Sequence, residues 1–102
     1  MVPPPVDDHA DPREHRREQV RRTLAHYAGR PAKALHPRLR LEADLDLMPL
    51  ELVLVATEIE EAVGMEVPVE GLASVETVAD LMRFFRRALA HGRRSHPLRR
   101  VA

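Results

Sequence analysis

Residues 48–56 read Met-Pro-Leu-Glu-Leu-Val-Leu-Val-Ala and begin a predicted helix whose first two turns hold one charged residue. Proline disfavours the α region for the residue before it, and its missing N–H costs nothing at the first helical position. Met48 is therefore predicted to be the cap, Pro49 the first helical residue and Gly64 the stop. Apolar residues recur at helical spacing along one face: Leu52, Val55, Ala56, Ile59 and Val63.

The opposite face of this helix is apolar as well, which is unusual for a surface helix. If one face packs into the core, Leu50, Val53 and Leu54 need other cover, together with Met48. Two alternatives remain open: leucines of the preceding loop cover these side chains, or the side chains form an exposed patch. Such a patch would be fringed by acids, as in a docking site for a basic, partly apolar surface: Glu51, Glu58, Glu60 and Glu61.

A first helix is predicted from Asp11-Pro12 to Gly29, with Val20, Leu24 and Tyr27 on its apolar face and its arginines in solvent. Residues 30–45 contain two prolines and scattered leucines, so we expect a long loop pinned to the core by those leucines.

Residues 69–73 allow one short helical turn, and a last helix is predicted to begin at Ser74 or Val75. Its apolar stripe follows helical spacing: Val78, Leu81, Met82, Phe85 and Leu89. The predicted fold class is all-α, with one helical domain over 12–91 between a disordered tail at 1–11 and a basic tail at 92–102.

Composition excludes several classes of function. Cysteine is absent, which removes disulfides, thiolate metal sites and a cysteine nucleophile. Neither a signal peptide nor a membrane span is recognisable, so a cytoplasmic location is the default expectation.

Charge is segregated along the chain: Leu41 to Met82 holds eleven of the 16 acidic residues and none of the 16 Lys and Arg. An acidic middle and basic ends are therefore expected.

No constellation of catalytic residues is recognisable, and the protein is predicted not to be an enzyme. The six histidines include no pair at the i, i+4 spacing of helical metal ligands, so no metal site is predicted. Basic ends suggest nucleic acid as a partner, but zero net charge and the acidic middle argue against it. Self-association stays open, because a helix that is apolar on two faces can pair with a second copy.

Beyond these patterns, three stretches resemble the acyl carrier proteins of fatty-acid and polyketide synthesis. Residues 41–47, Leu-Glu-Ala-Asp-Leu-Asp-Leu, resemble the end of the family's first loop, typically Leu-x-x-Asp-Leu-Gly-hydrophobic. Residues 60–68 resemble the end of its second helix and the following turn, and residues 72–81 its short third and fourth helices. The resemblance implies a four-helix bundle with a long loop between helices 1 and 2 and a short third helix.

The family's defining triplet, however, is absent. It reads Asp-Ser-Leu, and its serine carries 4′-phosphopantetheine; here the triplet is Met48-Pro49-Leu50, and proline has no hydroxyl. We therefore expect no phosphopantetheine cofactor. The other hydroxyls weighed as attachment sites are Ser74, Ser95 and Thr57, and none is expected at the exposed head of a helix beside an acid.

The resemblance thus implies a carrier-like protein that keeps part of a docking surface and lacks the attachment residue. We expect it to dock onto a basic surface of an enzyme of acyl or polyketide assembly, as a scaffold, regulator or decoy. The predicted docking residues are Met48, Leu50, Glu51, Leu54, Glu60 and Glu61. Two alternatives remain: a true carrier modified at an unorthodox site, and an interaction module that reuses the fold outside acyl metabolism.

Overall fold

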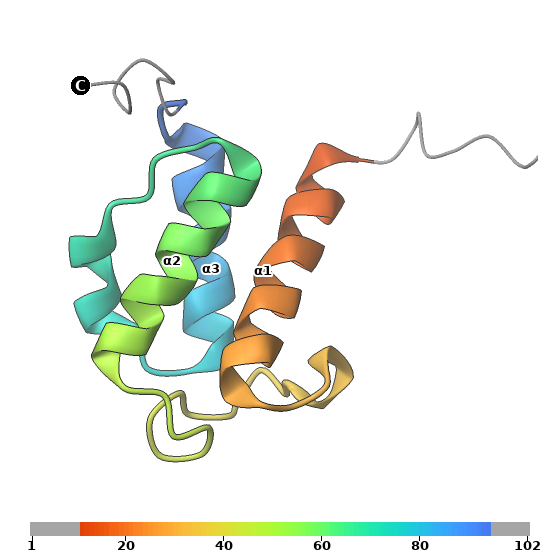
Figure 1. The fold of residues 1–102 in the computed structure, drawn as a ribbon, viewed down its shortest axis with the longest axis vertical. Helices are drawn as coiled ribbons and strands as arrows, with labels where there is room; N and C mark the ends of the chain where they lie inside the picture. Colours follow the sequence, from red (N-terminus) through yellow and green to blue (C-terminus); the bar gives the residue numbers. More distant parts are fainter. Residues whose placement is uncertain (1–10, 95–102) are drawn as a thin grey trace, which may run out of the picture.

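The computed structural model describes residues 11–94, and this part of the chain is all-α, as predicted. Its α-helices are α1 (Pro12–Ala28), α2 (Pro49–Val63) and α3 (Val78–His91). Two 3₁₀ segments lie in the connections, η1 (Ala32–Ala34) and η2 (Val69–Ser74). α1 and η2 each pack against other helices: α1 contacts α2 and α3 from one side, and η2 contacts both from the other (Figure 1).

The predicted boundaries of α1 and α2 are confirmed. The Asp11 carboxylate accepts a hydrogen bond from the Arg13 N–H at 3.0 Å and caps α1. Met48 is the N-cap of α2, and Pro49 is its first residue. Gly29 and Gly64 end the two helices in the left-handed region, with φ of 67° and 75°, where a residue without Cβ avoids a steric penalty.

The predicted start of α3 is wrong by about one turn. Thr77, and not Ser74 or Val75, is the N-cap: its hydroxyl accepts the Asp80 N–H at 3.1 Å, and the Asp80 carboxylate accepts the Thr77 N–H at 3.2 Å. This reciprocal capping box satisfies donors that a helix end otherwise leaves unpaired. Ser74 instead donates to the Gly71 carbonyl at 3.2 Å and closes η2, the short turn that was predicted.

The core is built from the predicted stripes together with loop leucines. Val20, Leu24, Val55, Ile59, Leu81 and Phe85 are buried, whereas Tyr27 and Met82 are only partly buried. The connection between α1 and α2 is pinned as expected. The buried leucines that anchor it are Leu35, Leu41, Leu45 and Leu47. Backbone hydrogen bonds from Leu41 N–H to Glu76 O and from Val78 N–H to Leu39 O, both 2.9 Å, tie it to the start of α3.

Two of the α1 arginines expected in solvent contribute to packing. The Arg16 guanidinium donates to the Leu89 carbonyl at 3.3 Å, near the end of α3, and Arg21 donates to the Ala32 carbonyl at 3.0 Å. Leu89 lies in the last turn of α3, where carbonyls lack intrahelical partners, so a cationic donor is favourable there. α1 is therefore fastened to α3 and η1 by polar as well as apolar contacts.

The expected tails at 1–11 and 92–102 lie largely outside the described residues. Within the described part, the segment after α3 pairs with the connection after α2: the Glu66 N–H donates to the Arg93 carbonyl at 2.7 Å, and Met65 and Arg94 form an isolated antiparallel bridge. The backbone directly after α3 thus pairs with the connection that follows α2. No helix among residues 11–94 combines the length and hydropathy required to span a bilayer.

Candidate docking surface

The start of α2 combines an exposed proline with a carboxylate cap. Pro49 occupies the first helical position and is exposed. The Glu51 carboxylate accepts the Met48 N–H at 2.9 Å, which is the carboxylate half of a capping box. Glu51 also places negative charge at the positive end of the helix dipole. Pro49 thus begins a helix whose start is held by the Glu51 carboxylate.

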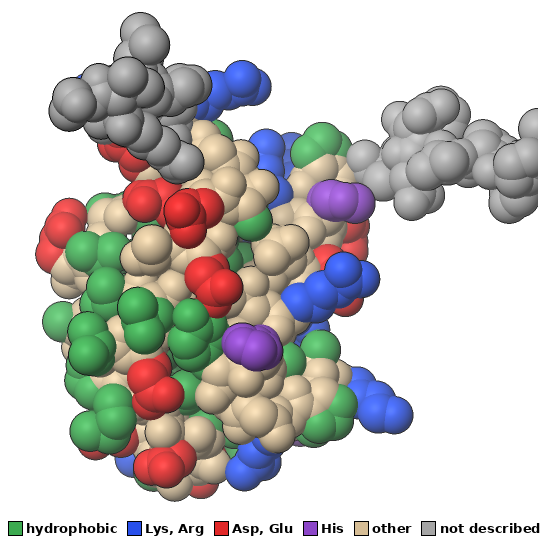
Figure 2. Space-filling model, viewed as in Figure 1, with side chains coloured by type: hydrophobic (Ala, Val, Ile, Leu, Met, Phe, Trp, Pro, Cys, Tyr) green, Lys and Arg blue, Asp and Glu red, His purple; other side chains and the backbone are tan. Residues whose placement is uncertain are grey.

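Three large apolar side chains at this end of α2 lie in solvent. Met48, Leu50 and Leu54 are 51%, 71% and 44% exposed, and Val69 of η2 is 39% exposed. We call these four residues the α2 patch. Leu50 and Leu54 are four residues apart and therefore neighbours on one helix face. Figure 2 shows hydrophobic side chains gathered over α2 and η2 with acidic side chains among them.

The α2 patch decides between the two alternatives left open by the sequence. The loop leucines do not cover the patch, because the side chains of Leu35, Leu41, Leu45 and Leu47 are buried in the core. Val53 alone among the doubtful side chains is partly buried against that core. Exposed apolar residues are common when scattered singly, whereas a group of them on one face makes a candidate interaction site.

The acids predicted for docking fall into two groups. Glu51 caps α2, and the Glu60 carboxylate accepts the Val67 N–H at 2.7 Å, so both hold the backbone around the helix. Glu61 is exposed, and so is Glu58, which the sequence placed at the fringe. The acids best placed to meet a partner are therefore Glu58 and Glu61.

Glu58 also faces α1. Hydrogen bonding toward its carboxylate raises the pKa of the Tyr27 phenol, with smaller contributions from desolvation and from the charge of Glu51. Tyr27 of α1 and Glu58 of α2 therefore interact across the two helices.

The described hydroxyls weighed as alternative attachment sites are engaged locally. Thr57 donates to the Val53 carbonyl at 2.9 Å, and Ser74 donates to the Gly71 carbonyl at 3.2 Å. A serine or threonine that bonds back to the preceding turn satisfies its own polar group. Ser95 lies outside the described residues.

Beside Pro49 lies a hollow of about 700 Å³ that sequence reasoning did not predict. Its apolar lining includes Leu47, Leu52 and Leu72, and Arg40 and Glu42 stand among its charged residues. The hollow arises where the loop before α2 meets η2, two segments far apart in sequence. The alternation of leucines and charges in 39–47 was a signal that one side of this loop faces solvent.

The described residues contain no group of three or more His, Asp or Glu side chains that could hold a metal ion.

Neither the models of known protein families nor the curated protein sequences contain a match to this chain. The likeness to acyl carrier proteins therefore rests on the quoted stretches of sequence alone.

Proposed function

We propose that this protein is a non-catalytic, acyl-carrier-like domain that docks through the α2 patch onto an enzyme of acyl or polyketide assembly. It would act there as a scaffold, regulator or decoy, without phosphopantetheine. The observation that carries the proposal is the exposure of Met48, Leu50 and Leu54 on a helix whose outward charges are acidic. A partner surface with apolar side chains flanked by Lys or Arg would bury the apolar group and pair the carboxylates.

The backbone before α2 supports the carrier-like part of the proposal. Asp46 has a φ of 57° and is the only non-glycine residue with positive φ among residues 11–94. It occupies the position at which the resembling loop motif typically has glycine. Left-handed geometry is what glycine adopts without cost and what Asp tolerates better than most residues. A conformation suited to glycine at this position is what a carrier-like loop predicts.

Docking is tested with the double variant Leu54→Arg, Glu61→Arg, which places two cations on the proposed surface. Affinity-tagged wild-type protein and the variant are used to capture partners from the native host, and captured proteins are identified by mass spectrometry. An acyl-assembly enzyme retained by wild type and lost by the variant is expected. If the same enzyme stays bound to the variant, the docking surface is wrongly placed.

A matched control is Ala90→Arg, Glu14→Arg, which makes the same two kinds of change at exposed positions on α3 and α1. This control should retain the partner. A wild-type partner with no role in acyl metabolism would instead favour the interaction module outside acyl metabolism, and the enzymatic context proposed here would be wrong.

The carrier alternative is tested by intact mass after incubation with coenzyme A and a phosphopantetheinyl transferase. Wild type is expected to keep its mass, because Pro49 has no hydroxyl and Thr57 and Ser74 are bonded to backbone carbonyls. The variant Met48→Asp, Pro49→Ser rebuilds the family's triplet and should gain one phosphopantetheinyl group. Modification of wild type would establish the carrier alternative.

A further inference from the structure

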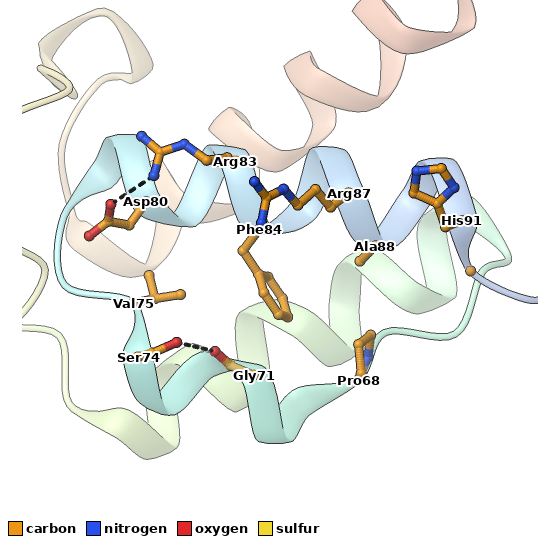
Figure 3. A pocket seen from close by; sticks show the side chains of 11 residues that line it. Pro68, Gly71, Ser74, Val75, Asp80, Arg83, Phe84, Arg87, Ala88 and His91 are labelled. Atoms are coloured by element: carbon orange, nitrogen blue, oxygen red, sulfur yellow. Dashed lines mark hydrogen bonds and ion pairs between the residues drawn. The ribbon is translucent and has the colours of Figure 1, made fainter.

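A second surface lies on the other side of η2, where η2 and α3 border a groove of about 490 Å³. Its apolar lining includes Pro68, Val75, Phe84 and Ala88. Figure 3 shows the Phe84 ring directed from α3 toward η2. Phe84 lies outside the apolar stripe predicted for α3 and is only partly buried: it packs against the core and also lines the groove.

Gly71 of η2 lies close against the Phe84 ring within the lining of the groove. A Cβ on Gly71 would lie 2.7 Å from Cε1 of Phe84, closer than side-chain atoms approach one another. Only glycine therefore allows the η2 backbone to pack against this edge of the ring. The Phe84 ring also meets Phe85 edge to face, with centroids 5.2 Å apart, which holds it in place.

Basic side chains follow the groove along α3. Arg83, Arg87 and His91 line it at successive spacings of four residues, about 6 Å apart along the helix axis. The acid among the lining residues, Asp80, accepts backbone hydrogen bonds at the start of α3 and pairs with Arg83 at 3.3 Å. Both members of this pair are substantially exposed, so Arg83 can exchange it for another carboxylate.

The groove and the α2 patch are complementary in charge and alike in having an apolar centre. The patch sets Leu50 and Leu54 among Glu58 and Glu61, whereas the groove sets Phe84 among cations. The patch and the groove share no residue. η2 contributes to both, with Val69 in the patch and Gly71 and Ser74 in the groove. Total acidic and basic residues balance at 16 each, so two copies meet without net repulsion.

We propose that the groove binds the α2 patch of a second copy of this chain, together with the neighbouring acids Glu58 and Glu61. Leu50 and Leu54 of one copy would cover the Phe84 ring of the other, and Glu58 and Glu61 would pair with Arg83 and Arg87. The contact joins two different surfaces and is therefore head to tail, which produces rings or short chains of copies. Self-association uses the same α2 patch as the proposed function and hides it from an enzyme partner.

The test is sedimentation velocity of the full chain over a range of concentrations at low ionic strength. Wild type should show a sedimentation coefficient that rises with concentration and falls when salt is added. Arg83→Glu, Arg87→Glu and, separately, Glu58→Arg, Glu61→Arg should each weaken association by about tenfold or more, since like charges then face each other. An equimolar mixture of the two variants should associate again, because each carries the charges that the other has lost.

The matched control is Arg13→Glu, Arg17→Glu, which reverses two exposed arginines at the same spacing on α1 and should associate like wild type. Circular dichroism of every variant checks that the helices are retained. A monomeric wild type at all concentrations, or a mixture that fails to associate, would overturn the proposal. A monomeric wild type that still captures an enzyme partner would overturn self-association and leave the proposed function standing, so the two failures are distinguishable.

Discussion

The carboxylate of Glu51 accepts a hydrogen bond from the backbone N–H of Met48, across the proline that begins α2. This contact gives Glu51, predicted as a docking residue, a role in holding the helix start. Glu51→Ala should lower the free energy of unfolding by about 0.5–1 kcal/mol, the scale of a lost cap. Glu51→Gln keeps an acceptor and should lose less. Urea denaturation of both variants measures the difference; equal losses would show that charge, and not the cap, matters.

Exposure of the α2 patch predicts that its side chains add little to stability. Leu50→Ala should change the free energy of unfolding by no more than about 0.5 kcal/mol, because Leu50 is 71% exposed. Leu52→Ala, two residues away and 6% exposed, should cost about 2–5 kcal/mol. The pair is compared by chemical denaturation. A large cost at Leu50 would mean that this side chain is covered within the domain.

The capping box at the start of α3 predicts unequal roles for two neighbouring hydroxyls. Thr77→Ala removes the acceptor of the Asp80 N–H and should destabilise the domain by about 1 kcal/mol. Ser74→Ala removes a hydrogen bond at an exposed site and should cost less than about 0.5 kcal/mol. Thermal unfolding of the two variants under the same conditions measures the contrast. A reversed order would place the helix start at Ser74.

Asp80 predicts a pH dependence of stability. Hydrogen bonds from the Glu76 and Thr77 backbone N–H groups lower the pKa of its carboxyl below the ordinary value for aspartate, with a further contribution from Arg83. A folded-state pKa below the unfolded one stabilises the fold above about pH 3.9, and this stability is lost as pH falls through the lowered pKa.

Asp80→Asn removes this titration. The variant should be less stable than wild type near neutral pH, and the gap between them should shrink as the solution is acidified below about pH 4. Urea midpoints measured at several pH values follow the gap. If the stability gap between variant and wild type stays constant as the pH falls below about 4, titration of the Asp80 carboxylate does not cause the pH dependence.

The left-handed backbone at Asp46 predicts opposite responses to two substitutions. Asp46→Gly should leave stability unchanged or raise it slightly, because glycine adopts φ of 57° without a steric penalty. Asp46→Val should cost about 1–2 kcal/mol, since a β-branched residue is strained there. Chemical denaturation of both variants provides the check. Tolerance of valine would imply that the loop can adopt another conformation.

The sequence by itself determined the boundaries of α1 and α2 and the all-α class, because these depend on local chemistry. Proline at a first helical position, glycine in a left-handed cap and apolar residues at helical spacing act within a few residues of one another. The start of α3 was also encoded locally, as Thr77 followed three residues later by Asp80. The prediction missed this start because it placed the beginning of the helix at Ser74 or Val75, a few residues earlier in the chain.

Tertiary structure alone decided that the outer apolar face of α2 stays in solvent. Periodicity indicated the core-facing stripe that contains Leu52, but it could not decide between cover by the loop leucines and exposure for Leu50 and Leu54. That choice depends on where Leu35, Leu41, Leu45 and Leu47 pack, and on contacts between segments 35 residues or more apart, such as Leu41 with Glu76. The groove along α3 likewise forms where η2 packs beside α3, with Gly71 close against Phe84. Long-range packing, which local sequence does not specify, therefore placed both surfaces on which the proposals rest.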